Sequence, residues 1–161
     1  MFATLKPVIY VQVSPERLTV KNLKSGEVIA EIPEMAISAL PKSKILAVGP
    51  EARIAAASQP AEVVNPFAHP RTLVSDFTVA EKLLKHYLRR IQCNSFLTLA
   101  PAVVMHPLGS PAGGFTQVER RAFREMALGA GASEVILWTG RVLTDQEVLS
   151  RQFPPGEGAW E

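Results

Sequence analysis

The stretch that decides the fold is Asp76-Phe77-Thr78-Val79-Ala80-Glu81-Lys82-Leu83-Leu84-Lys85-His86-Tyr87-Leu88-Arg89-Arg90-Ile91-Gln92. Its apolar residues recur at helical spacing and its basic residues fall mostly on the other side, which predicts an amphipathic helix. Thr78 and Glu81 fit a capping box, with Ser75 and Asp76 as rival N-caps. Because such a helix has to bury its apolar stripe against another element, the stretch indicates a layered domain.

The residues before this helix have the pattern of short strands. Val8 to Val13 is an apolar run, and Arg17 to Leu23 and Glu27 to Ile32 both alternate. The turn residues between the two alternating segments predict a hairpin. Two further short strands are expected over Met35 to Leu40 and Ile45 to Val48, where prolines separate the segments.

The residues after the helix alternate between strand and helix patterns. The expected elements are a buried strand over 101–106, a helix over 116–128, a strand over 134–138 and a short last helix. Capping boxes of Thr116 with Glu119 and of Thr144 with Glu147 mark the two helix starts. Strands first and then alternating helices and strands predict an α/β fold, a mixed sheet with helices on at least one face.

Composition limits the class of protein. The chain has 161 residues, 47% of them hydrophobic, which suits one domain with its own core. A net charge of +2 is too mild to predict a nucleic acid as partner. Cys93 is the only cysteine, which excludes an internal disulfide and fits a reducing compartment. Since the sequence has neither a signal-peptide pattern nor a run long enough to span a bilayer, we expect a soluble, cytoplasmic protein.

Residue patterns that could carry chemistry are incomplete. The glycine-rich loop 109–114 could cradle a phosphate, but it lacks both the P-loop ending and G-x-G-x-x-G, so a flexible connector is favoured. His69, His86 and His106 have no metal-ligand spacing and are expected to be structural. We therefore predict no catalytic residue, no metal and no cofactor, and a protein that acts by contacting other macromolecules.

Two groups of residues are candidate contact surfaces. Arg120, Arg121 and Arg124 make one face of the second helix basic; a solvated face is the default interpretation, and a partner contact is the alternative. Phe96 and Leu97 are large apolar residues in an expected loop. They either tuck into the core, which the residues alone favour, or form an exposed anchor.

Several of these segments together resemble a known family. Thr116 to Ala122, Gly129 to Ala132 and Glu134-Val135, preceded by Asp76 to Leu84 and Asn94 to Phe96, resemble MreB, the bacterial actin homologues that determine rod shape. The resemblance covers roughly residues 7–140 and only the N-terminal half of the family's length. It implies an actin-like (ribonuclease H-like) first half: a mixed sheet flanked by helices, with a small subdomain near 20–65. We thus expect a single domain over 1–161 with a divergent C-terminal part, 141–161, whose unrelated sequence favours a natural chain end.

The departures from the family pattern concern its nucleotide site. Tyr10 stands where the family has the metal-facing acid, and Gln12 replaces the glycine that lets the backbone approach phosphate. Thr139, with the two residues after it, replaces Glu-Glu-Pro, which includes the acid that helps to position the attacking water. The second phosphate loop and the adenine pocket belong to the other half of the family's length. The resemblance therefore implies a degenerate site with no productive nucleotide binding.

The function expected from this resemblance is non-catalytic. We expect protein–protein interaction, with a protein partner or as a homodimer, in cell shape or cytoskeletal regulation. The alternative is one half of a split ATPase completed by a second chain. In the family, the loop that matches Phe96 and Leu97 is a small membrane anchor, which implies weak contact with the inner face of the membrane. Without a second half, the edge beside the first strand and 134–138 would be covered by a partner and, in part, by Val148, Leu149 and Phe153.

Overall fold

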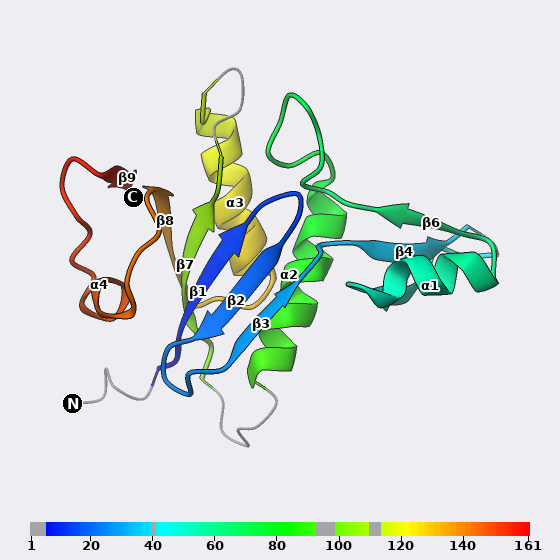
Figure 1. Cartoon of the computed structure of the whole chain (residues 1–161), viewed down its shortest axis with the longest axis horizontal. Coiled ribbons are helices and arrows are strands. Elements are labelled where there is room, and N and C mark those ends of the chain that lie inside the picture. The colour runs from blue at the N-terminus through cyan, green and yellow to red at the C-terminus, as the bar shows by residue number, and fades with distance from the viewer. Residues whose placement is uncertain (1–5, 40, 93–98, 110–113) are drawn as a thin grey trace.

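The chain forms two sheets and is described by a computed structural model over residues 6–39, 41–92, 99–109 and 114–161 (Figure 1). The main sheet has six strands in the order β3-β2-β1-β7-β8-β9. The strands are β1 (Val8–Val13), β2 (Leu18–Asn22), β3 (Val28–Glu31), β7 (Ala102–Pro107), β8 (Glu134–Gly140) and β9 (Gly158–Trp160).

The main sheet is mixed, as the sequence predicts. β1, β7 and β8 are parallel neighbours, whereas β2 and β3 continue the sheet as antiparallel strands on one side and β9 does so on the other. The predicted hairpin is confirmed as β2 and β3, with Gly26 at a φ of 79° in its turn. A positive φ there is open to glycine without the steric cost of a Cβ atom.

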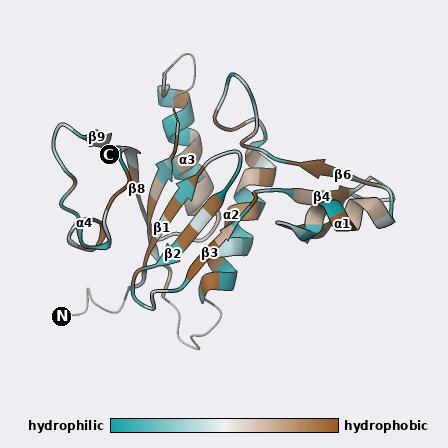
Figure 2. Ribbon diagram, viewed as in Figure 1, coloured by the Kyte–Doolittle hydropathy of each residue, from teal (hydrophilic) through white to brown (hydrophobic). Residues whose placement is uncertain are grey.

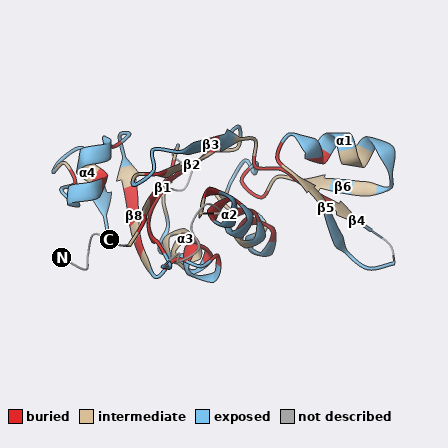
Figure 3. Cartoon of the chain, turned by 90° about the horizontal axis from the view of Figure 1, so that it is seen from below, coloured by how far each residue is buried: buried red, intermediate tan, exposed pale blue. Residues whose placement is uncertain are grey.

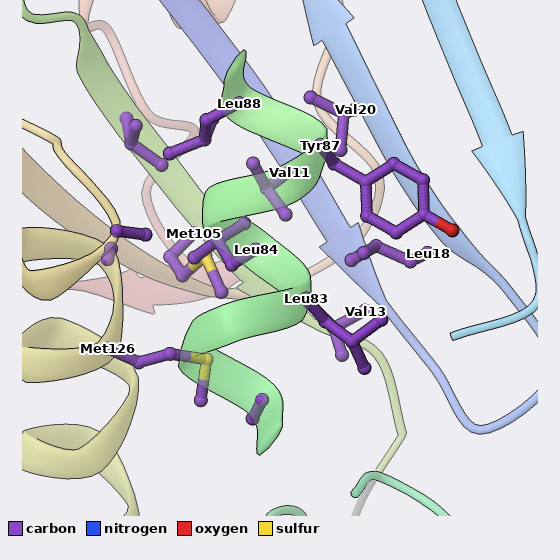
Figure 4. Close-up of a cluster of buried hydrophobic side chains, with 14 of the residues drawn as sticks. Val11, Val13, Leu18, Val20, Leu83, Leu84, Tyr87, Leu88, Met105 and Met126 are labelled. Carbon is purple, nitrogen blue, oxygen red and sulfur yellow. The ribbon is translucent and has the colours of Figure 1, made fainter. Parts of the chain in front are cut away.

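Two helices cover one face of this sheet, α2 (Phe77–Gln92) and α3 (Gln117–Gly129) (Figure 3). Leu83, Leu84 and Tyr87 of α2 are buried and meet the apolar residues that alternate along the strands (Figure 4). Hydrophobic stretches run along the central strands, whereas the colours are mixed around α2 and α3, as expected for amphipathic helices (Figure 2). Asp76, one of the predicted rivals, caps α2: its carboxylate accepts the backbone N–H of Val79 at 3.0 Å.

The second sheet forms a separate wing beside α2 (Figure 1). It consists of β4 (Met35–Ser38) between β5 (Lys44–Val48) and β6 (Ala61–Val64), with α1 (Glu51–Ser58) packed against it. The small subdomain was expected near 20–65, but residues 18–31 belong to the main sheet. The reason is that Leu18 and Val20 alternate into the core under α2, which leaves 35–64 for the wing.

The C-terminal segment, defined as residues 141–161, folds back over the other face of the main sheet. It contains α4 (Asp145–Ser150), opened by the predicted capping box of Thr144 and Glu147, and β9, which the sequence did not predict. Val148 and Phe153 are buried against the sheet, as expected. Leu149 is 52% exposed, so its predicted packing contact is wrong: α4 is a short helix and turns only one side inward.

Candidate functional site

The carboxyl ends of parallel strands are where open α/β sheets usually bind ligands. Here the ends of β7 and β8 and the residues just before α3 border a hollow of about 500 Å³. Its walls include Gly109, Gly114, Phe115 and Thr139. Residues 110–113 of the glycine-rich loop, whose flanks line this hollow, lie outside the described residues.

Tyr10 of β1 and His106 of β7 form a buried pair on the other face of the main sheet. The Tyr10 hydroxyl lies 2.6 Å from His106 Nδ1, and His106 Nε2 lies 2.9 Å from the carbonyl oxygen of Gly140. Because a carbonyl oxygen only accepts, Nε2 donates to Gly140, and Nδ1 of the neutral ring then accepts from Tyr10. The hydroxyl in turn accepts the backbone N–H of Leu143 at 3.2 Å. All of these polar groups are paired.

Burial keeps both side chains of the pair uncharged. It raises the pKa of Tyr10 above its usual value and lowers the pKa of His106 below its usual value. The hydrogen bond to Gly140 opposes the shift of His106, but burial is the larger cause. A neutral phenol, paired with a neutral imidazole, therefore stands at Tyr10, where the resemblance implies a metal-facing acid.

Gln12 and Thr139, the other two departures from the family pattern, lie apart from each other. Gln12 is half-buried on β1, opposite Thr19 of β2 and His106 of β7. Thr139 follows Leu137 in the alternation of β8, which puts it on the helix side of the sheet. Its hydroxyl donates to the carbonyl oxygen of Ala159 at 3.4 Å. The structure thus brings Tyr10 and Gln12 to one face and Thr139 to the opposite face.

Glycines allow the C-terminal segment to lie close to β8. A Cβ atom at Gly158 would meet the Thr139 carbonyl oxygen and the Trp138 ring, and one at Gly140 would meet the backbone of Glu157 and Gly158. Trp138 stacks on Phe153 with ring centroids 5.6 Å apart, and Phe153 lies 5.4 Å from Trp160. The sequence offered no periodic signal for this packing, because the close contacts are possible only where glycine has no side chain.

Ion pairs add to these contacts at the surface. Arg141 reaches Glu147 at 2.5 Å and Glu157 at 2.6 Å, and Arg151 reaches Glu134 at 2.6 Å. Arg141 lowers the pKa of Glu147 to about 2, and Arg151 lowers the pKa of Glu134. Exposed pairs of this kind contribute little each and weaken with salt.

The predicted partner arginines border the C-terminal segment. Arg120 and Arg124 lie 3.5 and 3.7 Å from the carboxylate of Glu161, and Arg120 also lies over the ring of Phe115. Arg121 is exposed. Their role in partner binding stays a prediction.

Several predicted features fall outside the described residues, namely Phe96, Leu97 and Cys93. Within the described ranges, no helix combines the length and the apolar character needed to cross a bilayer. The same ranges hold no cluster of three or more His, Cys, Asp or Glu side chains arranged for a metal ion.

Comparison with known proteins agrees with the resemblance. Residues 16–144 match the family model described as MreB/Mbl protein, a range that includes Thr139 and begins after Tyr10 and Gln12. The chain is 41% identical over 98 residues to the cell shape-determining protein MreB of Escherichia coli K12, covering 60% of this chain and 26% of that protein. It is 29% identical over 106 residues to the cell shape-determining protein Mbl of Bacillus subtilis, covering 65% of this chain and 30% of that protein. The chain thus spans about a quarter of the length of the curated MreB relative it matches.

Solved structures share the fold at low sequence identity. The crystal structure of MreB5 of Spiroplasma citri bound to ADP superimposes with a TM-score of 0.64 at 23% identity, covering 82% of this chain and 37% of that one. A non-polymerising mutant of MamK bound to AMPPNP gives a TM-score of 0.62 at 14% identity, covering 82% of this chain and 40% of that one. The fold is therefore actin-like, and with four-fifths of its residues inside the matched range, the chain belongs to the MreB/Mbl protein family.

Proposed function

We propose that this chain is a non-catalytic member of the MreB/Mbl family that acts by binding another protein in cell-shape or cytoskeletal regulation. The observation that carries the proposal is the buried Tyr10–His106 pair and its bond to Leu143 of the C-terminal segment. Side chains and backbone of the chain itself fill the side of β1 and β7 where the resemblance implies a metal and phosphate.

The argument against turnover rests on charge. Phosphoryl transfer depends on positioned charges and a metal ion around the phosphates. Tyr10, Gln12 and Thr139 offer no carboxylate, and burial keeps the Tyr10 phenol neutral. Restoring an acid at position 10 would leave His106 and the Leu143 N–H without the phenol that now pairs with them.

The argument for protein binding rests on the exposed apolar residues of the C-terminal segment. Val142, Leu149 and Trp160 are each more than half exposed, although other residues of the segment are well packed. Tryptophan is enriched at the energetic centres of protein interfaces. A partner protein or a second copy of the chain would cover these side chains. The cytoplasm is the location that fits the proposal, since the named relatives determine cell shape.

The alternative is half of a split ATPase, and one observation favours it. The hollow of about 500 Å³ at the ends of β7 and β8 is within the usual size range of small-molecule sites. A second chain would then have to supply the metal-binding acid and the remaining phosphate contacts.

Nucleotide titration tests whether this chain binds or hydrolyses nucleotide by itself. Mg-ATP and Mg-GTP are titrated to millimolar concentrations while the melting temperature and phosphate release are followed, with the Escherichia coli MreB as positive control. A ligand at 100 times its dissociation constant stabilises a protein by about 2.7 kcal/mol. We expect no shift and no release. Saturable stabilisation by nucleotide, or phosphate release above that of buffer, would refute the non-catalytic function.

Weak contact with a membrane surface is a further part of the proposal. It rests on Phe96 and Leu97 and on the resemblance alone. Burying two such side chains contributes roughly 1.5–3 kcal/mol each, which gives marginal anchoring. Vesicle co-sedimentation of the wild type should exceed that of a folded Phe96→Ser/Leu97→Ser double variant, and equal pelleting would remove membrane contact from the proposal.

A further inference from the structure

The outer end of the wing holds a recess. We call it the wing-tip recess: a space of about 570 Å³ whose lining includes Ser38, Lys42, Lys44, Leu46 and Gln59. The Ser38 hydroxyl donates to the carbonyl oxygen of Lys42 at 3.3 Å, which ties two sides of the recess together. The outer ends of β4 and β5 point away from α2 and α3 (Figure 3), so this recess is separate from the hollow at the ends of β7 and β8.

The charge of the wing-tip recess is positive. Among the described residues that line it, only Lys42 and Lys44 carry a charge, and both are exposed. No carboxylate in the described ranges lies within ion-pair distance of either lysine. The third cation of the wing differs, because Arg53 is held by Glu34 at 2.8 Å. The two lysines are therefore available to an anionic group from outside.

The acids of the wing lie elsewhere. Glu51 begins α1, whose other end borders the recess, and a helix of eight residues is about 12 Å long. Glu62 lies opposite Ile37 of β4. Lys44 lies opposite Ser38, the next residue of β4. Because successive residues of a strand point to opposite faces, Glu62 and Lys44 lie on opposite faces of the second sheet.

The end of α1 accounts for only part of this positive charge. The backbone carbonyls at a helix C-terminus carry about half an elementary negative charge, and α1 has no basic residue in its last turn. Balancing that end takes one of the two lysines at most. The recess therefore keeps a positive charge that a carboxylate can neutralise.

An apolar side chain stands beside the two lysines. The register of β5 against β4 shifts between Ile45 and Ala47, which leaves Leu46 without an opposite residue, as in a β-bulge. Leu46 is half-buried and borders both the wing-tip recess and a second space, of about 510 Å³, between β5 and α2. It thus offers an apolar contact next to Lys44.

The same features make a second copy of the chain a poor occupant. β5 is an edge strand of the second sheet. Lysines and bulges are devices by which edge strands avoid pairing with another molecule, and two wing tips brought together would also place like charges against each other. The acids of the C-terminal segment are each paired within their own chain, namely Asp145, Glu147, Glu157 and Glu161.

We propose that the wing-tip recess binds an extended acidic segment of a partner protein. Carboxylates of the segment pair with Lys42 and Lys44, and one of its apolar side chains packs on Leu46. Contacts of side chains, rather than a shared backbone ladder, hold the segment. This inference rests on the proposed function, since it names the chemistry of the protein partner.

The test uses a labelled peptide and the whole chain. A twelve-residue peptide that repeats Glu-Leu-Glu-Ser is titrated by fluorescence anisotropy at low and at physiological salt. We expect saturable binding that weakens as salt rises. Lys42→Glu/Lys44→Glu should bind at least about tenfold more weakly, because it turns two attractive contacts into repulsive ones. Leu46→Ser should weaken binding by a smaller factor, about threefold, since it removes one apolar contact.

Controls match the charge change and the fold. Lys82→Glu/Lys85→Glu makes the same two replacements at exposed lysines of α2, outside the recess, and its affinity should stay within about twofold of the wild type. A peptide with Gln in place of Glu should not bind. Unchanged circular dichroism and melting temperature qualify each variant as folded.

Cross-linking locates the bound peptide. A carbodiimide joins a carboxylate to an amine only where the two are in contact, and mass spectrometry then identifies the lysine that has reacted. We expect the peptide on Lys42 and Lys44 in preference to Lys82 and Lys85.

Four results would overturn the inference. They are no saturable binding of the peptide at millimolar concentration, equal loss in the two double variants, cross-links mainly on the α2 lysines, and binding of anionic phosphatidylserine vesicles without binding of the peptide. These outcomes differ from failure of the proposed function, which would appear as nucleotide turnover whatever the peptide does.

Discussion

The two faces of the main sheet are covered in different ways, although alternate residues of the same strands supply both. Among the residues that the structure describes, the face under α2 and α3 belongs to a cluster of 24 buried residues. The face under the C-terminal segment has six, among them Tyr10, Trp138 and Phe153. Since burial of apolar area is the main source of stability, the helix face should set the global stability. The other face should open at a lower free energy.

The contacts of the smaller face are of a different kind. Close approach at glycines, an aromatic stack, the Tyr10–His106 pair and exposed ion pairs replace the broad apolar packing of the helices. Each of these depends on a specific group in a specific place. Single substitutions should therefore release the C-terminal segment while the rest of the molecule stays folded.

The largest effect is expected on the helix face. Phe123 of α3 is fully buried and lies between Phe67 and Phe115. Phe123→Ala should reduce the free energy of unfolding by about 3–5 kcal/mol, because it leaves a cavity in the core. Urea denaturation followed by circular dichroism measures this. Leu149→Ala, at an exposed site in α4, is the control and should change the free energy of unfolding by less than about 0.5 kcal/mol. A comparable loss in both variants would contradict the view that the helix face sets the global stability.

Tyr10→Phe tests the polar contacts on the opposite face. Removing the hydroxyl leaves His106 Nδ1 and the backbone N–H of Leu143 without a partner. Leaving a buried polar group unpaired costs about 1–3 kcal/mol. Hydrogen exchange should increase in residues 141–161 and stay unchanged in α2. Equal increases in both regions would mean that the two faces open as one unit.

Gly158→Ala tests the close approach of β9 to β8. The added methyl group would meet the Thr139 carbonyl oxygen and the Trp138 ring, so β9 has to move away. Overpacking of this kind lowers the free energy of unfolding by about 1–3 kcal/mol. Because β9 is exposed and can shift, we expect a loss at the lower end of this range. Fluorescence of Trp138 and Trp160 should report the displacement. Gln152→Ala, an exposed change in the same segment, is the control and should leave the spectrum as in the wild type.

Acid should weaken the C-terminal segment before it affects the helices. Arg141 holds the pKa of Glu147 at about 2 in the folded protein, below its ordinary value of 4.5. A group with a lowered folded pKa stabilises above its unfolded pKa, and this contribution is lost as the pH falls from about 4.5 towards 2. Tryptophan fluorescence should change in this window. Glu147→Gln, which keeps a residue suited to the capping box, should reduce that change; an identical titration would show that Glu147 is not involved.

The sequence predicts the helix face far better than the other face. Helical spacing in 76–92 and the capping box of Thr116 and Glu119 are local signals, and both helices form where these signals lie. β9 escapes prediction because Gly158, Ala159 and Trp160 are exposed and have no strand pattern of their own. The bond between Tyr10 and His106 joins residues 96 apart, which no local pattern encodes.

The same contrast explains the candidate site. The residue types at positions 10, 12 and 139 could be compared with a family pattern. The face of the sheet on which each side chain lies could not be predicted from the sequence. The resemblance implied a small subdomain near 20–65, and the sequence of a short strand does not show which sheet the strand joins. Which sheet a strand joins depends on which core its buried residues reach, as Leu18 and Val20 do under α2.

The bond between the Tyr10 hydroxyl and the backbone of Leu143 also has a consequence for synthesis of the protein. It joins residues 133 apart, so one partner is made long before the other. At about 5–20 residues per second, a ribosome adds Leu143 roughly 7–27 s after Tyr10. During that interval β1 can pair with β2, but its Tyr10 side has no cover. A nascent chain of this protein therefore exposes a ready target for chaperones until its last elements have been made.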